Sequence, residues 1–234
     1  MNTKNVRRSI CLMLFLSPPI ALAQDHLEPE VGIMYADKTS YEYCQNLNEL
    51  FFSKSPSDYL ARMFCRPGFG KPQWCVTVYK DKKQNCVVEF IVAEKSIDHK
   101  KDSLSIKVKR ESQPIDLETA QIVQVVFRQM LRGVRYSDQE KQAGDGDEFN
   151  FSRNVLGWDG FDQKLGEPPL GSEQGLIYDP EVGSLTEKLV KIGDELKRFA
   201  TTASNNEARN TIRAEIRRQA KELMDKATIP QGGT

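Results

Sequence analysis

The middle of the chain changes its hydrophobic period from that of strands to that of a helix. Trp74–Lys80 and Cys86–Ala93 are rich in β-branched and aromatic residues, and residues 103–109 alternate apolar and polar side chains. These runs predict three strands of an antiparallel meander. Asp116 then marks the start of a helix as its N-cap. The apolar stripe of that helix suits a central helix packed on the sheet, and it comprises Leu117, Ala120, Val123, Val126, Phe127, Met130 and Val134.

Helical patterns precede these strands. Over residues 41–52 the apolar side chains recur at steps of three and four, which predicts a helix. A second short helix is predicted to follow, because Ser57 or Asp58 can cap its start and Pro67 ends it. The two segments would form an N-terminal helical hairpin.

Further elements follow the central helix. Phe149 and Phe151 alternate as in a strand, and residues 174–178 predict another strand. Capping boxes at residues 184–187 and 204–207 begin two amphipathic helices that complete the C-terminal part. The sequence therefore predicts an α+β fold, in which an antiparallel sheet of about three to five strands packs with a central helix, the N-terminal helical hairpin and two C-terminal helices.

The N-terminus has the pattern of a secretory signal peptide over residues 1–23. Basic residues Arg7 and Arg8 precede an apolar run that is too short to span a bilayer. Ala21-Leu22-Ala23 then gives the small-x-small cleavage pattern. We therefore expect cleavage after Ala23 and a soluble product in the bacterial periplasm.

The predicted domain organisation is simple, because neither an internal repeat nor a clean linker is present. A single α+β domain is expected over residues 40–228. The polar segment 24–39 shows no periodicity, which predicts a flexible N-terminal arm, and residues 229–234 are expected to form a disordered tail.

Cysteine usage agrees with export. Cys11 would leave with the signal peptide, and four cysteines remain: Cys44, Cys65, Cys75 and Cys86. An even number in an oxidising compartment implies two disulfides, which would staple the N-terminal half. Three connectivities are open, and we favour Cys44–Cys65 with Cys75–Cys86 because each bond would join segments expected to lie side by side. A zinc site is the alternative, but it lacks both a Cys-x-x-Cys pair and a nearby histidine.

The overall charge excludes several classes of protein. Lys+Arg and Asp+Glu each number 33, whereas a bulk nucleic-acid binder would carry a basic excess. A hydrophobic fraction of 39% excludes a protein with several membrane spans as well as a disordered chain. We therefore expect neither a nucleic-acid partner nor a membrane-spanning segment in the exported chain.

The charge is unevenly spread, because residues 137–183 hold eleven acidic residues against three basic ones, with aromatic residues among them. Acidic side chains steer cationic partners and aromatic side chains supply contact area. We therefore predict a surface for a protein partner, and a cationic partner fits it best. Its candidate residues are Asp145, Asp147, Glu148, Trp158, Asp159, Phe161 and Asp162. The alternatives are a saccharide platform, a calcium site at Asp145-x-Asp147 and solvated turns above core aromatics.

The last helix carries a second candidate surface. Its basic ridge repeats at steps of four and comprises Arg209, Arg213, Arg217 and Lys221. Such a ridge could dock an acidic partner or the surface of a membrane. The alternative is a solvated face with pairs of Glu and Arg one turn apart.

Catalytic chemistry has little support in the sequence. His26 and His99 adjoin no recognisable nucleophile motif. Paired carboxylates are the one enzymatic chemistry left open, since a glycosidase needs two of them, one with a raised pKa. We assign no catalytic residue, cofactor or metal, and leave the oligomeric state open.

Together these features predict an exported, soluble, non-enzymatic interaction protein of the bacterial periplasm. Its most concrete forms are an inhibitor or immunity-type protein that binds a secreted or delivered effector, and an accessory subunit of an envelope secretion or transfer system. The alternative is a protein that binds or hydrolyses cell-wall saccharides through Asp/Glu pairs.

Overall fold

A six-stranded antiparallel sheet organises the structure, which is a computed structural model. It describes residues 26–29, 38–53, 59–68, 70–97, 106–135, 146–154, 172–202 and 205–227. The strands are β1 (Tyr59–Arg66), β2 (Trp74–Lys80), β3 (Cys86–Ala93), β4 (Val108–Pro114), β5 (Glu148–Asn154) and β6 (Ser172–Tyr178). The helices are α1 (Lys38–Leu47), the π-helix η1 (Asn48–Phe52), α2 (Leu117–Arg132), α3 (Leu185–Thr201) and α4 (Asn206–Ala227).

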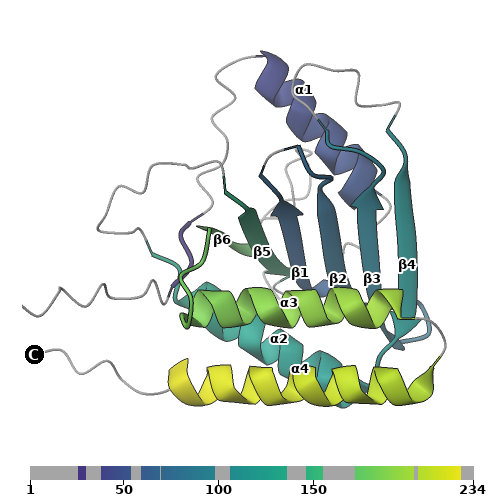
Figure 1. Cartoon of the computed structure of the whole chain (residues 1–234), viewed down its shortest axis with the longest axis vertical. Helices are drawn as coiled ribbons and strands as arrows, with labels where there is room; N and C mark the ends of the chain where they lie inside the picture. The colour runs from purple at the N-terminus through teal and green to yellow at the C-terminus, as the bar shows by residue number, and fades with distance from the viewer. Residues whose placement is uncertain are drawn as a thin grey trace, which may run out of the picture.

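The strand order is β4-β3-β2-β1-β5-β6, so the chain begins its sheet in the interior. From β1 it winds outward to β4, and α2 then returns it to the other side of β1 (Figure 1). The predicted α+β class, the antiparallel sheet and the meander of β2, β3 and β4 are confirmed.

Three helices cover one face of the sheet. The central helix α2 packs on β1, β5 and β6, while α3 packs on β2, β3 and β4. Helix α4 forms an outer layer against both (Figure 1). Gly193 of α3 faces Met63 of β1 so closely that a Cβ there would overlap the Met63 side chain. The predicted central helix and the two C-terminal helices are therefore confirmed, and a glycine sets how near α3 lies to the sheet.

Predicted helix caps are formed by short polar side chains. The Asp116 carboxylate accepts a 2.9 Å hydrogen bond from the Thr119 amide at the start of α2. At α3 the Ser184 hydroxyl accepts one of 3.0 Å from the Glu187 amide. At α4 the Asn205 side chain accepts bonds from the amides of Glu207 and Ala208, so this cap lies one residue after the serine of the predicted box.

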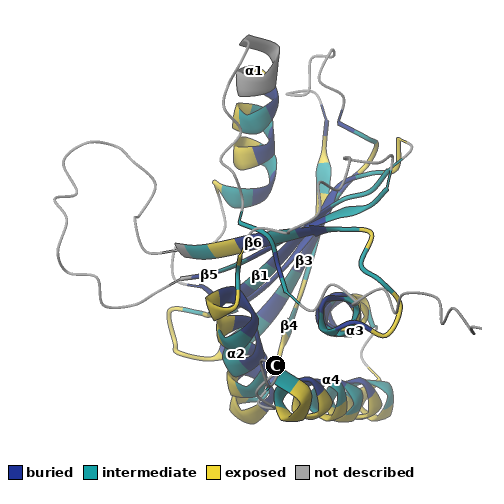
Figure 2. Cartoon of the chain, turned by 90° about the vertical axis from the view of Figure 1, so that its left-hand side faces the viewer, coloured by how far each residue is buried: buried dark blue, intermediate teal, exposed yellow. Residues whose placement is uncertain are grey.

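The opposite face of the sheet carries α1 and η1. Figure 2 shows α1 on the side of the sheet away from α2, α3 and α4. Buried side chains of α1 and η1 form a second core with Phe64, Cys75 and Ile91 of the sheet. The rings of Phe51 and Phe64 meet edge to face with centroids 5.2 Å apart. The sheet is therefore covered on both faces in its interior strands.

The predicted helical hairpin is wrong, because residues 59–66 form β1 rather than a second helix. β1 pairs with β2 on one side and β5 on the other, and most of its side chains are buried. A strand buried on both faces loses the alternation of apolar and polar residues that identifies a strand. The spacing of Leu60 and Phe64 therefore imitates a helical step.

The predicted disulfide staples are also wrong, because the described residues contain no disulfide bond. Cys65 and Cys86 belong to the core under α2 and α3, whereas Cys75 and Cys44 pack in the core under α1. Each favoured bond would therefore have to join opposite faces of the sheet. Side chains on opposite faces of a sheet point away from each other, whereas a disulfide requires side chains that point toward each other and Cα atoms within about 7 Å.

Two boundaries also differ from expectation. The sheet has six strands, and the fourth runs over Val108–Pro114 rather than 103–109, of which residues 103–105 lie outside the described residues. Within the segment 24–39, where a flexible arm is expected, residues 26–29 join the sheet, and α1 begins at Lys38. The segments 1–23 and 229–234 lie outside the described residues.

Candidate functional site

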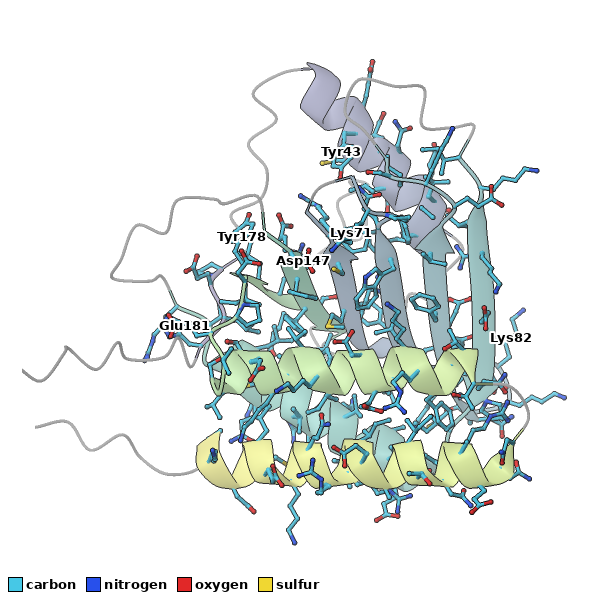
Figure 3. All side chains as sticks on the ribbon, viewed as in Figure 1. Tyr43, Lys71, Lys82, Asp147, Tyr178 and Glu181 are labelled. Atoms are coloured by element: carbon cyan, nitrogen blue, oxygen red, sulfur yellow. The ribbon has the colours of Figure 1, made fainter. Side chains whose placement is uncertain are left out.

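The β5–β6 pair gathers acidic residues at one end of the sheet. Asp147 and Glu148 stand where β5 begins, and Asp179 and Glu181 follow β6. Glu148 is directly opposite Tyr178 in the antiparallel register, so the two ends meet. Figure 3 shows Asp147, Tyr178 and Glu181 on the side of the molecule formed by these strands. We call Asp147, Glu148, Asp179 and Glu181 the acidic corner.

The backbone of the acidic corner is fixed by reciprocal hydrogen bonds. The Asp147 amide donates to the Asp179 carboxylate at 2.9 Å, and the Asp179 amide donates to the Asp147 carbonyl at 3.1 Å. The Asp147 carboxylate in turn accepts a 2.9 Å bond from the Gly68 amide. A Cβ at Gly146 would overlap the Asp179 carboxylate, so the glycine is needed for this approach. Both carboxylates are thus held in place by main-chain donors.

Glu148 is turned inward and satisfied within the protein. Its carboxylate lies 3.3 Å from the Arg66 guanidinium and accepts a 2.6 Å bond from the Asn150 amide group. The Tyr178 hydroxyl also bonds to Glu148, and burial together with that carboxylate raises the pKa of Tyr178 to about 12. Glu148 is therefore a largely buried, paired member of the acidic corner rather than an exposed one, because only 14% of its side chain is exposed.

Val182 is the most exposed large apolar residue of the described part of the chain. It is 92% exposed in the turn between β6 and α3, directly after Glu181. An exposed apolar side chain next to an acidic one combines contact area with charge, which partner-binding surfaces use. Val182 could not be predicted from the sequence, because a lone valine between Glu181 and Gly183 carries no pattern.

Four residues of the predicted acidic surface, Trp158, Asp159, Phe161 and Asp162, belong to a segment that attaches elsewhere, whereas Asp145 directly precedes Gly146. All five lie outside the described residues. The segment 155–171 leaves the sheet at Asn154 and returns at Ser172, which are Cα partners. These attachment points lie at the other end of β5 from Glu148, about 20 Å away at 3.3 Å per residue. Of the predicted surface residues, Asp147 and Glu148 are the two that the structure describes.

The basic ridge of α4 is largely engaged inside the protein. Arg217 lies 2.6 Å from Asp116 and 2.8 Å from Glu118, at the start of α2. Arg213 lies 3.3 Å from Asp116. These residues line an open hollow of about 460 Å³ between α2 and α4. Two of the four ridge residues therefore join α4 to α2.

The ends of the ridge differ from its middle. Arg209 donates a 3.1 Å bond to the Thr202 carbonyl, which ties the start of α4 to the end of α3. Lys221 is exposed. The sequence pattern placed all four residues on one face of α4, and the structure shows that the face borders α2 and α3 over part of its length.

Asp194 in α3 is a further carboxylate that the sequence did not single out. Burial, with a contribution from the charge of Asp147, raises the pKa of Asp194 in α3. Nearby, the Lys197 ammonium lies 4.4 Å from the centroid of the Trp74 ring and 5.5 Å from that of Phe90. Asp194 follows a glycine on the sheet side of α3. That position is its only sequence signal, since it lies outside the acidic segment.

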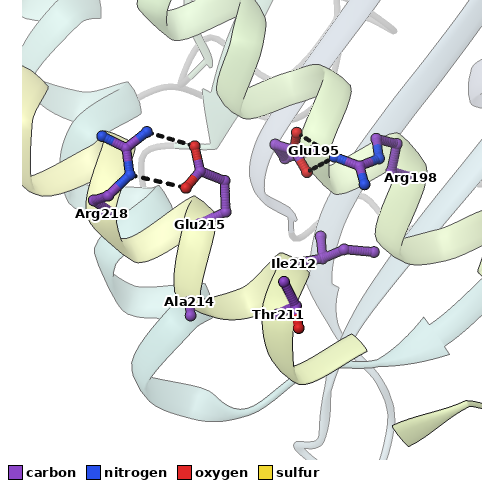
Figure 4. Close-up of a pocket in the computed structure, with 7 residues that line it drawn as sticks. All are labelled: Glu195, Arg198, Thr211, Ile212, Ala214, Glu215 and Arg218. Carbon is purple, nitrogen blue, oxygen red and sulfur yellow. Dashed lines mark hydrogen bonds and ion pairs between the residues drawn. The ribbon is translucent and has the colours of Figure 1, made fainter. Parts of the chain in front are cut away.

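Open hollows occur on the helical side. One of about 330 Å³ lies between α3 and α4 (Figure 4). Its charged side chains pair with one another, Arg198 with Glu195 at 2.6 Å and Arg218 with Glu215 at 2.5 Å. Within the described ranges, no group of three or more His, Cys, Asp or Glu residues is placed to hold a metal ion. No helix among the described residues is both long and apolar enough to cross a bilayer.

Comparisons of the chain with protein-family models, with curated proteins and with solved structures find no match.

Proposed function

We propose that this chain is an exported protein of the bacterial envelope that binds a cationic protein partner through the acidic corner. An inhibitor or immunity-type protein that covers a secreted or delivered effector fits this description, as does an accessory subunit of an envelope secretion or transfer system. The observation that carries the proposal is that main-chain amides fix two carboxylates at one end of the sheet, that of Asp179 through the Asp147 amide and that of Asp147 through the Gly68 amide.

Fixed carboxylates favour binding for two reasons. Their position costs little conformational entropy when a partner arrives, because main-chain donors already hold both side chains. Their charge also raises the rate of encounter with a cationic surface and disfavours acidic competitors. The exposed Val182 supplies an apolar contact inside the same surface.

The first experiment is an affinity capture. The mature chain, residues 24–234, is immobilised and exposed to envelope and secreted extracts at low and moderate salt, and bound proteins are identified by mass spectrometry. The proposal predicts one stoichiometric basic protein whose retention falls as salt rises. Capture of no protein, or of a partner insensitive to salt, contradicts it.

Export is tested separately. The N-terminal sequence of the protein recovered from the periplasm should begin at Gln24, since the leader is predicted to end at Ala23. Recovery of the chain only from the cytoplasm with Met1 at its terminus would contradict export.

One observation favours the alternative of saccharide hydrolysis. Burial raises the pKa of Asp194, as a general acid requires, and the charge of Asp147 contributes to that rise. Release of reducing sugar from purified cell wall by the wild type, lost in Asp194→Asn with the fold retained, would support this activity. An inert wild-type protein would reject it.

A further inference from the structure

Residues 26–29 join the outer edge of β6 through a single antiparallel β-bridge between Glu28 and Leu176. The Glu28 amide donates to the Leu176 carbonyl at 2.9 Å, and the Leu176 amide donates to the Glu28 carbonyl at 2.8 Å. A third main-chain bond of 3.1 Å runs from the Arg135 amide, just beyond α2, to the Leu27 carbonyl. We call residues 26–29 the strap.

Leu27 anchors the strap. Leu27 is fully buried in the core under the helices. Its socket exists because β6 has a glycine at position 175. A Cβ at Gly175 would lie 2.8 Å from the Val134 side chain and 2.9 Å from the Leu27 Cβ, which is too close for either. A glycine inside a strand commonly marks such an approach by another segment.

We propose that the β6 edge with this socket is a strand-binding site, and that its ligand is an extended peptide carrying a leucine. The N-terminal segment of the mature chain is its occupant, supplied in the structure by the same molecule. Two features support exchange. The strap and β6 share one reciprocal pair of hydrogen bonds, and Leu27 is the one buried residue of the strap. Strand addition to a sheet edge takes affinity from main-chain bonds and specificity from side-chain pockets.

The site is distinct from the acidic corner and does not depend on the proposed function. It has a consequence for the exported chain, because the predicted cleavage after Ala23 leaves Leu27 as the fourth residue. The new N-terminus would itself close the sheet edge, which protects β6 from pairing with other chains. A second copy could supply the same segment in exchange.

The test uses a chain that lacks the strap, residues 30–234, and a fluorescent synthetic peptide of residues 24–31. Anisotropy should show saturable binding with one peptide per chain. The same peptide with Leu27→Asp should bind at least about tenfold more weakly, because its anchor cannot enter the socket. Equal binding of both peptides, or no binding to a chain whose circular dichroism is native, overturns the proposal.

A second variant decides the question if the shortened chain does not fold. In the full mature chain, Leu27→Asp should release the strap and speed hydrogen exchange at the Leu176 amide by at least about tenfold. The matched control is Leu117→Asp, because Leu117 is 52% exposed and lies in α2 away from β6. The control should leave Leu176 protected. Unchanged protection of Leu176 in Leu27→Asp also overturns the proposal.

Discussion

Arg217 of α4 binds the carboxylate that caps α2. One guanidinium nitrogen lies 2.6 Å from the Asp116 Oδ1 atom, which also accepts the Thr119 amide at 2.9 Å. The Arg217 Nε atom donates to the Thr119 hydroxyl at 2.7 Å. A single carboxylate therefore starts one helix and fixes another against it, although the two residues are separated by about a hundred positions in the chain.

This contact predicts a coupled loss of stability. Asp116→Ala removes both the cap and the acceptor of Arg217, and should lower the free energy of unfolding by roughly 1–3 kcal/mol. Urea unfolding of Asp116→Ala, Arg217→Ala and the double variant forms a mutant cycle. The double variant should cost less than the sum of the single variants. Strict additivity would show that the two residues do not interact in solution.

Acid should weaken the same contact. Burial alone would raise the pKa of Asp116, but its bonds from Thr119 and the charge of Arg217 leave it below the usual value. Its stabilising contribution is therefore complete above the unfolded pKa near 3.9 and is lost as the pH falls through the lower folded value. The difference in unfolding free energy between the wild type and Asp116→Asn should shrink on going from pH 7 to about pH 3. A constant difference would contradict this.

Asp194 should show the opposite dependence. Its pKa is raised by burial, so the folded protein holds that proton more tightly than the unfolded chain does. Its contribution to stability is complete below the unfolded pKa and is lost as the pH rises through the raised folded value. Asp194→Asn, which stays neutral, should therefore unfold at higher urea concentration than the wild type at pH 7, with little difference near pH 3. Equal urea midpoints for the two proteins at pH 7 would show that the ionised Asp194 carboxylate does not destabilise the fold.

The cysteine thiols should remain reduced in the folded chain. Cys65, Cys75 and Cys86 are buried, and burial raises the pKa of each thiol. Alkylation of these three residues should be slow in the native protein and fast in urea, because the thiolate is the reactive form. The melting temperature should also be the same with and without a reductant. A mass lowered by disulfide formation, together with a lower melting temperature in reductant, would contradict the fold.

Much of the fold follows from the sequence where residue type or hydrophobic period identifies an element. β2 and β3 were predictable because they are rich in β-branched and aromatic residues, and the helix stripe from Ala120 to Met130 was predictable because its period separates buried from exposed positions. β1 was not, since it is buried on both faces and contains no β-branched residue. The predicted bounds of β4 were wrong, because the strand lies at a sheet edge and its charged run, Lys109-Arg110-Glu111, has no apolar pattern.

The candidate site was predictable in composition but not in geometry. An excess of acidic residues is visible in the sequence, and Asp147 and Glu148 were among the candidates. Their separate roles depend on long-range pairing, since Glu148 meets Arg66 and Asp147 meets Asp179 only in the assembled sheet. The disulfide pattern failed for the same reason, because the count of cysteines does not reveal which face of a strand each one occupies.

The central claim is that the fixed carboxylates of the acidic corner bind a cationic protein. The most direct measurement is a side-by-side capture with the wild type, with Asp147→Asn/Asp179→Asn, and with Asp225→Asn on the exposed end of α4 as control. The double variant keeps acceptors for the Gly68 and Asp147 amides while it removes two charges. At low salt the double variant should retain the partner about tenfold more weakly than the wild type, and the control should retain it equally well. Equal retention by all three proteins would contradict it.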